Sequence, residues 1–397
     1  MRPLASRMSV MSGEGALSVF ARAKELERAG RSIIHLELGE PDFHPASSVN
    51  GALKRALDEG KDRYCPVPGV PALRDALVAY LRDTRNVNVA PQNIVIAPGC
   101  KIALFMAMMA LIDPGDEVLY PDPGFPGYAS ITLGLGGVPV PFELSARNNL
   151  QPDPDAIVAK IRPRTKVLIT NSPGNPTGTV YRDEVQRQLA ELAVKHDLLA
   201  LSDEIYARII YDGTYKSMTS YPGMEERTLI IDGFSKSFAM TGWRLGYTVA
   251  PLRIVPALEM LVMNTYTCVA EFTQYGAIEA LRDREGATPR MLCEFSRRRE
   301  QFVRDLNSIP GFRCVPPEGA FYAWVDITET GQSAEELCRI MLEEAGVAAI
   351  PGAAFGLGGR NYVRFSFASS TAILHEAVER ILRVSSTWHR AIAGSSM

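Results

Sequence analysis

Short apolar runs alternate with longer amphipathic segments through the middle of the chain, from about residue 93 to residue 250. Several of these runs are continuously apolar, which is typical of strands that helices cover on both faces. Apolar residues recur at helical spacing in 102–112 and 182–196. The alternation predicts βαβ units and an α/β fold with a mostly parallel sheet of seven strands. The predicted strands are 93–97, 117–120, 138–142, 166–170, 198–202, 228–232 and 246–250.

The pattern changes near residue 290, where long amphipathic segments surround a few short strands such as 320–325 and 362–367. This change predicts a second, smaller α+β domain, because one core rarely grows to the size of the whole chain. We expect a large domain over 46–288, and a small domain built from 1–45 and 289–397.

Composition narrows the class of protein. The 397 residues are 46% hydrophobic and 22% charged with a net charge of −3, which is typical of a soluble globular protein and offers no basic surface for nucleic acid. We find no apolar stretch of membrane-spanning or signal-peptide length. The six cysteines show no disulfide framework and the five histidines no metal-ligand spacing, so we expect no metal and a cytoplasmic location.

The stretch 233–247, GFSKSFAMTGWRLGY, carries the strongest chemical signal. Lys236 lies there among small, hydroxyl and aromatic residues, surroundings that favour a neutral amine able to form a Schiff base with an aldehyde. The planar donor fork of Arg244 suits a phosphate, and the hydroxyl of Ser235 can add a hydrogen bond. Pyridoxal phosphate (PLP) has both an aldehyde and a phosphate.

Two more predicted strands end in polar residues at the same sheet edge. Asp203 follows the strand 198–202, and Asn175 lies in the turn after the strand 166–170. Ligands of open α/β sheets bind at the carboxyl ends of the strands, so both side chains are candidates for holding a cofactor.

The segment 98–104, PGCKIAL, joins a predicted strand to a predicted helix. The backbone amides of Gly99, Cys100 and Lys101 would lie at the start of that helix, where an anion is favoured. We expect them to form the second half of a phosphate site, opposite Arg244.

These motifs closely resemble those of class I and II aminotransferases, PLP enzymes of fold-type I, from about residue 30 to residue 383. The resemblance implies that Lys236 holds the cofactor and that Asp203 keeps its pyridine nitrogen protonated. It also implies that Tyr206 and Asn175 hydrogen-bond the phenolate oxygen, and that the ring of Phe125 stacks on the pyridine face.

The same resemblance places the substrate and a second subunit. Arg364, in the segment YVRFSF, would clamp the substrate α-carboxylate, and the backbone of Gly39, in LGEPD, would help to hold it. Tyr64, in RYCPVPG, matches a tyrosine that reaches the cofactor phosphate of the neighbouring subunit. We therefore expect a homodimer whose active sites are shared across the interface.

The implied activity is ping-pong transfer of an amino group from an L-amino acid to a 2-oxo acid, with Lys236 as general base and acid. One alternative keeps PLP but eliminates, decarboxylates, cyclises or oxidises the substrate. A more remote one is the PLP-binding domain of a transcription regulator, although no room remains before residue 30 for a DNA-binding domain.

The substrate side chain is harder to predict. We expect 12–16 and 264–274 to line its pocket, where Tyr266 and Glu271 would favour an aromatic, polar or cationic substrate. The sequence offers no obvious second basic residue for an acidic side chain.

Overall fold

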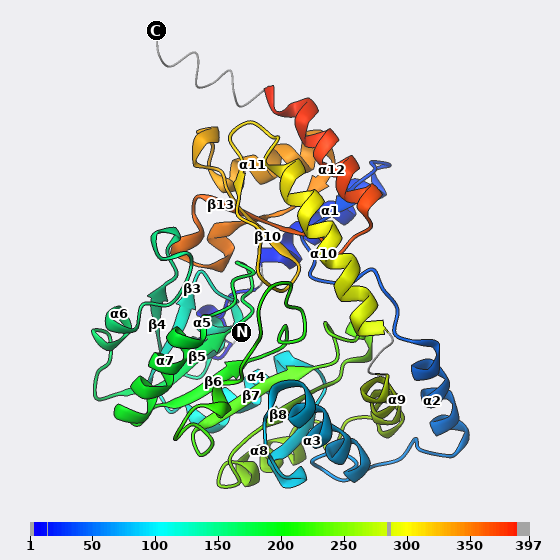
Figure 1. The fold of residues 1–397 in the computed structure, drawn as a ribbon, viewed down its shortest axis with the longest axis vertical. Coiled ribbons are helices and arrows are strands. Elements are labelled where there is room, and N and C mark those ends of the chain that lie inside the picture. The colour runs from blue at the N-terminus through cyan, green and yellow to red at the C-terminus, as the bar shows by residue number, and fades with distance from the viewer. Residues whose placement is uncertain (1–3, 14, 284–286, 387–397) are drawn as a thin grey trace.

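The computed structural model of the chain describes residues 4–13, 15–283 and 287–386. Its centre is a seven-stranded sheet of order β2-β8-β7-β6-β5-β3-β4 (Figure 1). Strand β8 is antiparallel to both of its neighbours, and the other pairs are parallel. The strands are β2 (Ile94–Ala97), β3 (Glu117–Asp122), β4 (Val138–Glu143), β5 (Thr165–Asn171), β6 (Leu199–Asp203), β7 (Thr228–Gly233) and β8 (Gly246–Val249).

Helices cover both faces of this sheet, which explains the continuously apolar strands. In β7, Leu229 and Ile231 pack on the face covered by α4 and α8, whereas Ile230 between them packs with α3 and α9 on the other face. The helices of this region are α2 (Ser47–Asp58), α3 (Pro71–Arg85), α4 (Cys100–Leu111), α5 (Gly127–Gly134), α6 (Pro154–Val158), α7 (Asp183–Lys195), α8 (Val255–Met263) and α9 (Glu271–Arg282).

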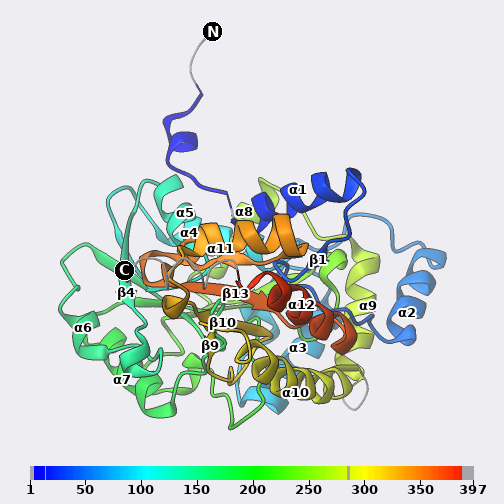
Figure 2. The same ribbon diagram turned by 90° about the horizontal axis from the view of Figure 1, so that it is seen from above.

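A second group of elements packs above the first in Figure 1, and joins the beginning of the chain to its end. Its four-stranded sheet has the order β12-β13-β10-β9, and β1 pairs in parallel with β11. Ala23 and Leu26 of α1 pack with Ala348 of β11, although the two elements come from opposite ends of the sequence, and Figure 2 shows α1 close to α11. The elements are α1 (Gly15–Arg28), β1 (Ile34–His35), α10 (Ala287–Leu306), β9 (Arg313–Cys314), β10 (Tyr322–Asp326), α11 (Ala334–Ile340), β11 (Val347–Ala348), β12 (Ile350–Pro351), β13 (Tyr362–Ser366) and α12 (Thr371–Val384).

The predicted α/β architecture is confirmed, and the strand limits differ from the prediction by one or two residues. The differences of two residues are at 117–120, where β3 continues to Asp122, and at 320–325, where β10 begins only at Tyr322. Ala320 has a φ of 56° and so cannot continue a strand. Within the described residues, no helix has the length and apolar character needed to cross a membrane.

Candidate active site

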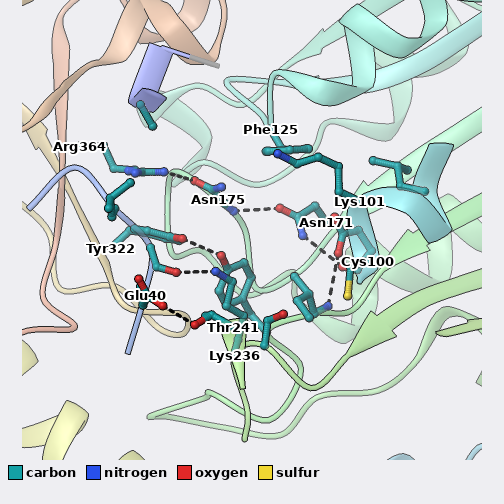
Figure 3. A pocket seen from close by; sticks show the side chains of 18 of the residues that line it. Glu40, Cys100, Lys101, Phe125, Asn171, Asn175, Lys236, Thr241, Tyr322 and Arg364 are labelled. Carbon is teal, nitrogen blue, oxygen red and sulfur yellow. Dashed lines mark hydrogen bonds between the residues drawn. The ribbon is translucent and has the colours of Figure 1, made fainter. Parts of the chain in front are cut away.

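A cavity of about 340 Å³ lies between the carboxyl edge of the seven-stranded sheet and the four-stranded sheet. It brings together residues that are more than three hundred positions apart in the sequence, such as Gly39 and Arg364 (Figure 3). The predicted site residues that line it are Gly39, Cys100, Lys101, Phe125, Asn175, Asp203, Tyr206, Ser235, Lys236, Arg244 and Arg364.

Lys236 enters this cavity from the compact loop that follows β7. The backbone of the buried Phe234 fixes the loop, since its N–H donates to Leu245 and its carbonyl accepts from Met240. The Nζ of Lys236 donates to the backbone carbonyl of Gly39, which holds the amine inside the cavity (Figure 3).

Asp203 ends β6 at the floor of the cavity. Its Oδ2 accepts a hydrogen bond of 2.6 Å from the hydroxyl of Tyr128, and its Oδ1 accepts one of 3.3 Å from the backbone N–H of Ile205. Burial raises the pKa of the Asp203 carboxyl to about 6, despite the opposing effect of these hydrogen bonds. A buried carboxylate in this state is stabilised by a cation brought beside it, such as a protonated ring nitrogen.

Arg244 and the start of α4 form a narrow polar corner. Gly99 has a φ of 94°, and a Cβ added there would lie 2.5 Å from Nη2 of Arg244. A Cβ added to Gly246 would lie 2.6 Å from the backbone nitrogen of Cys100. Both glycines are therefore needed for the guanidinium and the first amides of α4 to approach the same space, which suits a phosphate. Gly99 belongs to this corner, although its own atoms do not line the cavity.

Arg364, on β13, enters the cavity from the four-stranded sheet. Its Nη1 donates to Oδ1 of Asn175 at 2.9 Å, its Nη2 donates to the carbonyl of Glu37, and its guanidinium lies 4.4 Å from the centre of the Tyr322 ring. Because Arg364 occupies the amide oxygen of Asn175, the amide NH₂ of that residue is oriented as the group available for donation.

Asn171, at the end of β5, fixes the turn that carries Asn175. Its Oδ1 accepts the backbone N–H of Asn175 at 2.9 Å, and its Nδ2 donates to the carbonyl of Asp203 at 3.1 Å. One asparagine thus connects the ends of two neighbouring strands.

Phe125 and Lys101 form another wall. The Phe125 ring is 5.5 Å from that of Tyr128 in an edge arrangement, and Nζ of Lys101 is 5.8 Å from the Phe125 ring centre. Figure 3 shows the side chain of Lys101 extending beside Phe125. The sequence predicted a role for the backbone of Lys101 only, so this placement of its side chain is a new observation.

Two predictions about the substrate pocket are wrong for the cavity of this chain. Tyr266 donates to the carbonyl of Ile96 at 3.1 Å and packs against the cores around the sheet, and Glu271 begins α9. Neither side chain lines the cavity. Of the segment 12–16, Ala16 lines the cavity, and Glu14 lies outside the described residues.

Tyr64 also lies apart from the cavity of its own chain. Tyr64 is 86% exposed, so its hydroxyl is accessible to a neighbouring subunit.

Sequence reasoning missed Tyr128, Asn171 and Tyr322. Asn171 could have been found, because it ends a predicted strand at the same edge as Asp203. The two tyrosines reach the site only through packing between elements, and nothing local distinguishes them from core residues.

Comparison with known proteins agrees with this geometry. Residues 31–381 match the family described as aminotransferase class I and II. Among relatives, an aspartate aminotransferase of Pyrococcus horikoshii is 38% identical, with 95% of this chain and 96% of the relative covered. An aspartate/prephenate aminotransferase of Thermus thermophilus is 38% identical, with coverage of 97% and 99%.

A solved structure of this family is also similar to the chain in fold and in sequence. The aspartate aminotransferase from Thermus thermophilus with maleate superposes with a TM-score of 0.92 at 37% identity, and the match covers 97% of this chain and 100% of that one. The chain belongs to the class I and II aminotransferase family, and is a PLP-dependent enzyme that transfers amino groups.

Proposed function

We propose that the cavity around Lys236 holds PLP and carries out amino transfer between an amino acid and a 2-oxo acid. The observation that carries this proposal is the convergence of three chemistries on one cavity: the Lys236 amine, the buried Asp203 carboxylate and the Arg244 guanidinium. They match the aldehyde, the ring nitrogen and the phosphate of the cofactor, in that order. When bound, PLP supplies an aldehyde that combines with amines and a ring that withdraws electrons from the substrate α-carbon.

Each protein group then has one task. Arg244, Ser235 and the amides of Gly99, Cys100 and Lys101 bind the phosphate. The remaining residues contact the ring of the cofactor. Asp203 pairs with its nitrogen, Tyr206 and Asn175 donate to its phenolate oxygen, and Phe125 stacks on its face.

Lys236 is the proton carrier of the reaction. Its Nζ would take a proton from the substrate α-carbon and return it at C4′ of the cofactor, the carbon on the other side of the substrate nitrogen, so that Lys236 acts as general base and then general acid. Arg364, with the backbone of Gly39, holds the α-carboxylate and thereby fixes the direction of the bond that breaks. The contact between Nζ and the Gly39 carbonyl supports this assignment, because it brings the amine beside the predicted carboxylate site.

Dicarboxylic substrates are the class that we propose. The support is the cationic side chain of Lys101, which lies beside Phe125 in the cavity and away from the contact between Arg364 and Asn175. This cation can pair with a second carboxylate of the substrate. The names of two relatives, aspartate and aspartate/prephenate aminotransferase, agree with this class.

A substrate panel tests the proposal. The PLP-loaded enzyme is mixed with one amino acid at a time and no acceptor, and the released 2-oxo acid is measured. We expect aspartate and glutamate to give the fastest release, and Lys236→Ala to give none while keeping its circular dichroism spectrum. Lys101→Gln should reduce the preference for acidic over apolar amino acids by about tenfold, the value of one charged hydrogen bond. Release of ammonia in place of a stored amino group would contradict amino transfer.

We further propose a homodimer in which Tyr64 reaches the partner's phosphate. The exposure of Tyr64 supports this, as do the exposed Leu4, Met8 and Val10 of an N-terminal segment that extends from the body of the protein in Figure 2.

We also propose a cytoplasmic location, because the buried cysteines Cys314 and Cys338 are unpaired, as is typical of proteins in a reducing compartment.

A further inference from the structure

Two phenol hydroxyls meet at the edge of the cavity. The hydroxyl oxygens of Tyr206 and Tyr322 are 2.6 Å apart, and both side chains are buried. Tyr206 follows β6 of the large sheet, whereas Tyr322 is the first residue of β10 in the four-stranded sheet. The hydrogen bond therefore connects the two halves of the site (Figure 3).

A count of protons limits what this pair can do. Each phenol hydroxyl has one proton to donate and can also accept, and phenols keep their protons at neutral pH. One of the two protons occupies the hydrogen bond between the oxygens, so only the other can be donated elsewhere. If Tyr206 donates into the cavity, then Tyr322 has to donate to Tyr206.

Tyr322 is held in place from several sides. Its ring lies against the Arg364 guanidinium at 4.4 Å, and it meets the Tyr206 ring edge-on at 5.7 Å. A Cβ added to Gly39 would lie 2.0 Å from the Tyr322 hydroxyl oxygen, so the hydroxyl occupies space that only a glycine at position 39 leaves open. Phenylalanine could make the ring contacts equally well, which leaves the hydrogen bond to Tyr206 as the task of the hydroxyl.

We propose that Tyr322 is a positioning residue for amino transfer, whose hydroxyl donates to Tyr206 and so directs the Tyr206 proton into the cavity. This inference rests on the proposed function, in which Tyr206 donates to the phenolate oxygen of PLP. An anionic acceptor beside Tyr206 favours the arrangement in which Tyr322 donates to Tyr206 over the one in which Tyr206 donates to Tyr322. The hydrogen bond that Tyr322 donates also polarises the Tyr206 hydroxyl, and so strengthens the hydrogen bond that Tyr206 donates into the cavity.

A spectroscopic pH titration of the PLP-loaded enzyme tests the proposal. The measured quantity is the pH midpoint of the cofactor's visible absorption band, which reports the proton on the Lys236 nitrogen. Tyr206→Phe should raise the midpoint by about 1 pH unit, because the phenolate oxygen that loses a donor holds the neighbouring proton more strongly. Tyr322→Phe should raise it in the same direction by about 0.5 unit, since its effect acts through Tyr206.

The double variant separates positioning from general structural damage. In the Tyr206→Phe background, Tyr322→Phe should cause no further shift, because the hydroxyl that it orients is absent. The matched control is Tyr211→Phe, which removes a nearby hydroxyl that donates to the Ala320 carbonyl and lies outside the cavity lining. It should leave the midpoint unchanged.

Two results would overturn the inference: an unchanged midpoint in Tyr322→Phe, or an equal shift in both backgrounds. Failure of the proposed function itself is recognised separately, because the wild-type protein would then show no titrating band, or Lys236→Ala would retain it.

Discussion

Asp203 is a buried carboxylate whose charge is favourable only when a cation lies beside it. Its pKa is raised by burial to about 6, above the value of about 3.8 expected in the unfolded chain. Without cofactor, its contribution to folding is therefore fully present below about pH 4 and is lost as the pH rises through 6. Above pH 7 the ionised side chain costs the cofactor-free protein up to about 3 kcal/mol.

The effect of Asp203→Asn on the free energy of unfolding should depend on PLP: neutral or stabilising without the cofactor, and destabilising relative to the wild type with it. In urea unfolding at pH 8 without PLP, we expect the variant to be as stable as the wild type or more stable, with the difference vanishing towards pH 4. With PLP, the wild type should gain more, because its carboxylate then pairs with the ring nitrogen. If PLP stabilises both proteins equally, Asp203 does not face the ring nitrogen.

The sequence was sufficient to predict which strand-end residues lie together at the cavity. Lys236, Arg244 and Asp203 each lie at a strand end or beside one, so the alternation of strands and helices already brings them to one edge. Tyr322 could not be predicted, because its contact with Tyr206 spans 116 positions and depends on how the two sheets pack. The same limit applies to the side chain of Lys101, because its place beside the ring of Phe125 depends on how α4 packs against the segment after β3.

At the scale of elements, a buried ion cluster fixes the ends of β6 and β7, the two strands that lead to Asp203 and to the Lys236 loop. Arg85, the last residue of α3, donates to Glu204 at 2.8 Å and also to Asp232, and Tyr247 donates to Asp232 at 2.7 Å. Glu204 directly follows β6, and Asp232 lies near the end of β7. The Arg85 guanidinium thus pairs with two carboxylates, one next to Asp203 and one near the Lys236 loop.

Arg85→Met should lower the free energy of unfolding by about 3–5 kcal/mol, because it leaves two buried carboxylates without a cation. Arg85→Met combined with Glu204→Gln and Asp232→Asn should recover most of that loss, since no buried charge is left unpaired. Arg82→Met, on the same helix but with a side chain 59% exposed, is the control and should change stability by less than about 0.5 kcal/mol. Urea unfolding at pH 7 measures all three, and equal losses in the single and triple variants would contradict the charge argument.

Element limits were predictable to within a few residues because the apolar pattern is strong, but the cluster around Arg85 was not. Arg85 ends an amphipathic helix, a position where arginine is usually solvated and complements the helix dipole. Only the packing of α3 against β7 and β8 buries it, and no sequence period reports that packing.

At the scale of the whole molecule, the proposed homodimer would build each phosphate site from two chains. Arg244, Ser235 and the start of α4 come from the chain that supplies Lys236, whereas Tyr64 is exposed and lies outside the cavity of its own chain. If Tyr64 serves the partner, each site of a homodimer combines the lysine of one subunit with the tyrosine of the other. In such an arrangement, a subunit that lacks Lys236 and a subunit that lacks Tyr64 can together form one complete site.

Lys236→Ala and Tyr64→Ala should therefore restore activity to each other in mixed dimers. A hybrid dimer has one site with both wild-type residues and one site with neither, so random exchange of equal amounts makes about a quarter of all sites wild type. We expect about that fraction of the wild-type amino transfer rate, at a PLP concentration too low to saturate Tyr64→Ala alone. The same proteins mixed without subunit exchange provide the control. If exchange instead leaves the mixture with only the activity of its Tyr64→Ala subunits, Tyr64 does not act across the interface, whatever the oligomeric state.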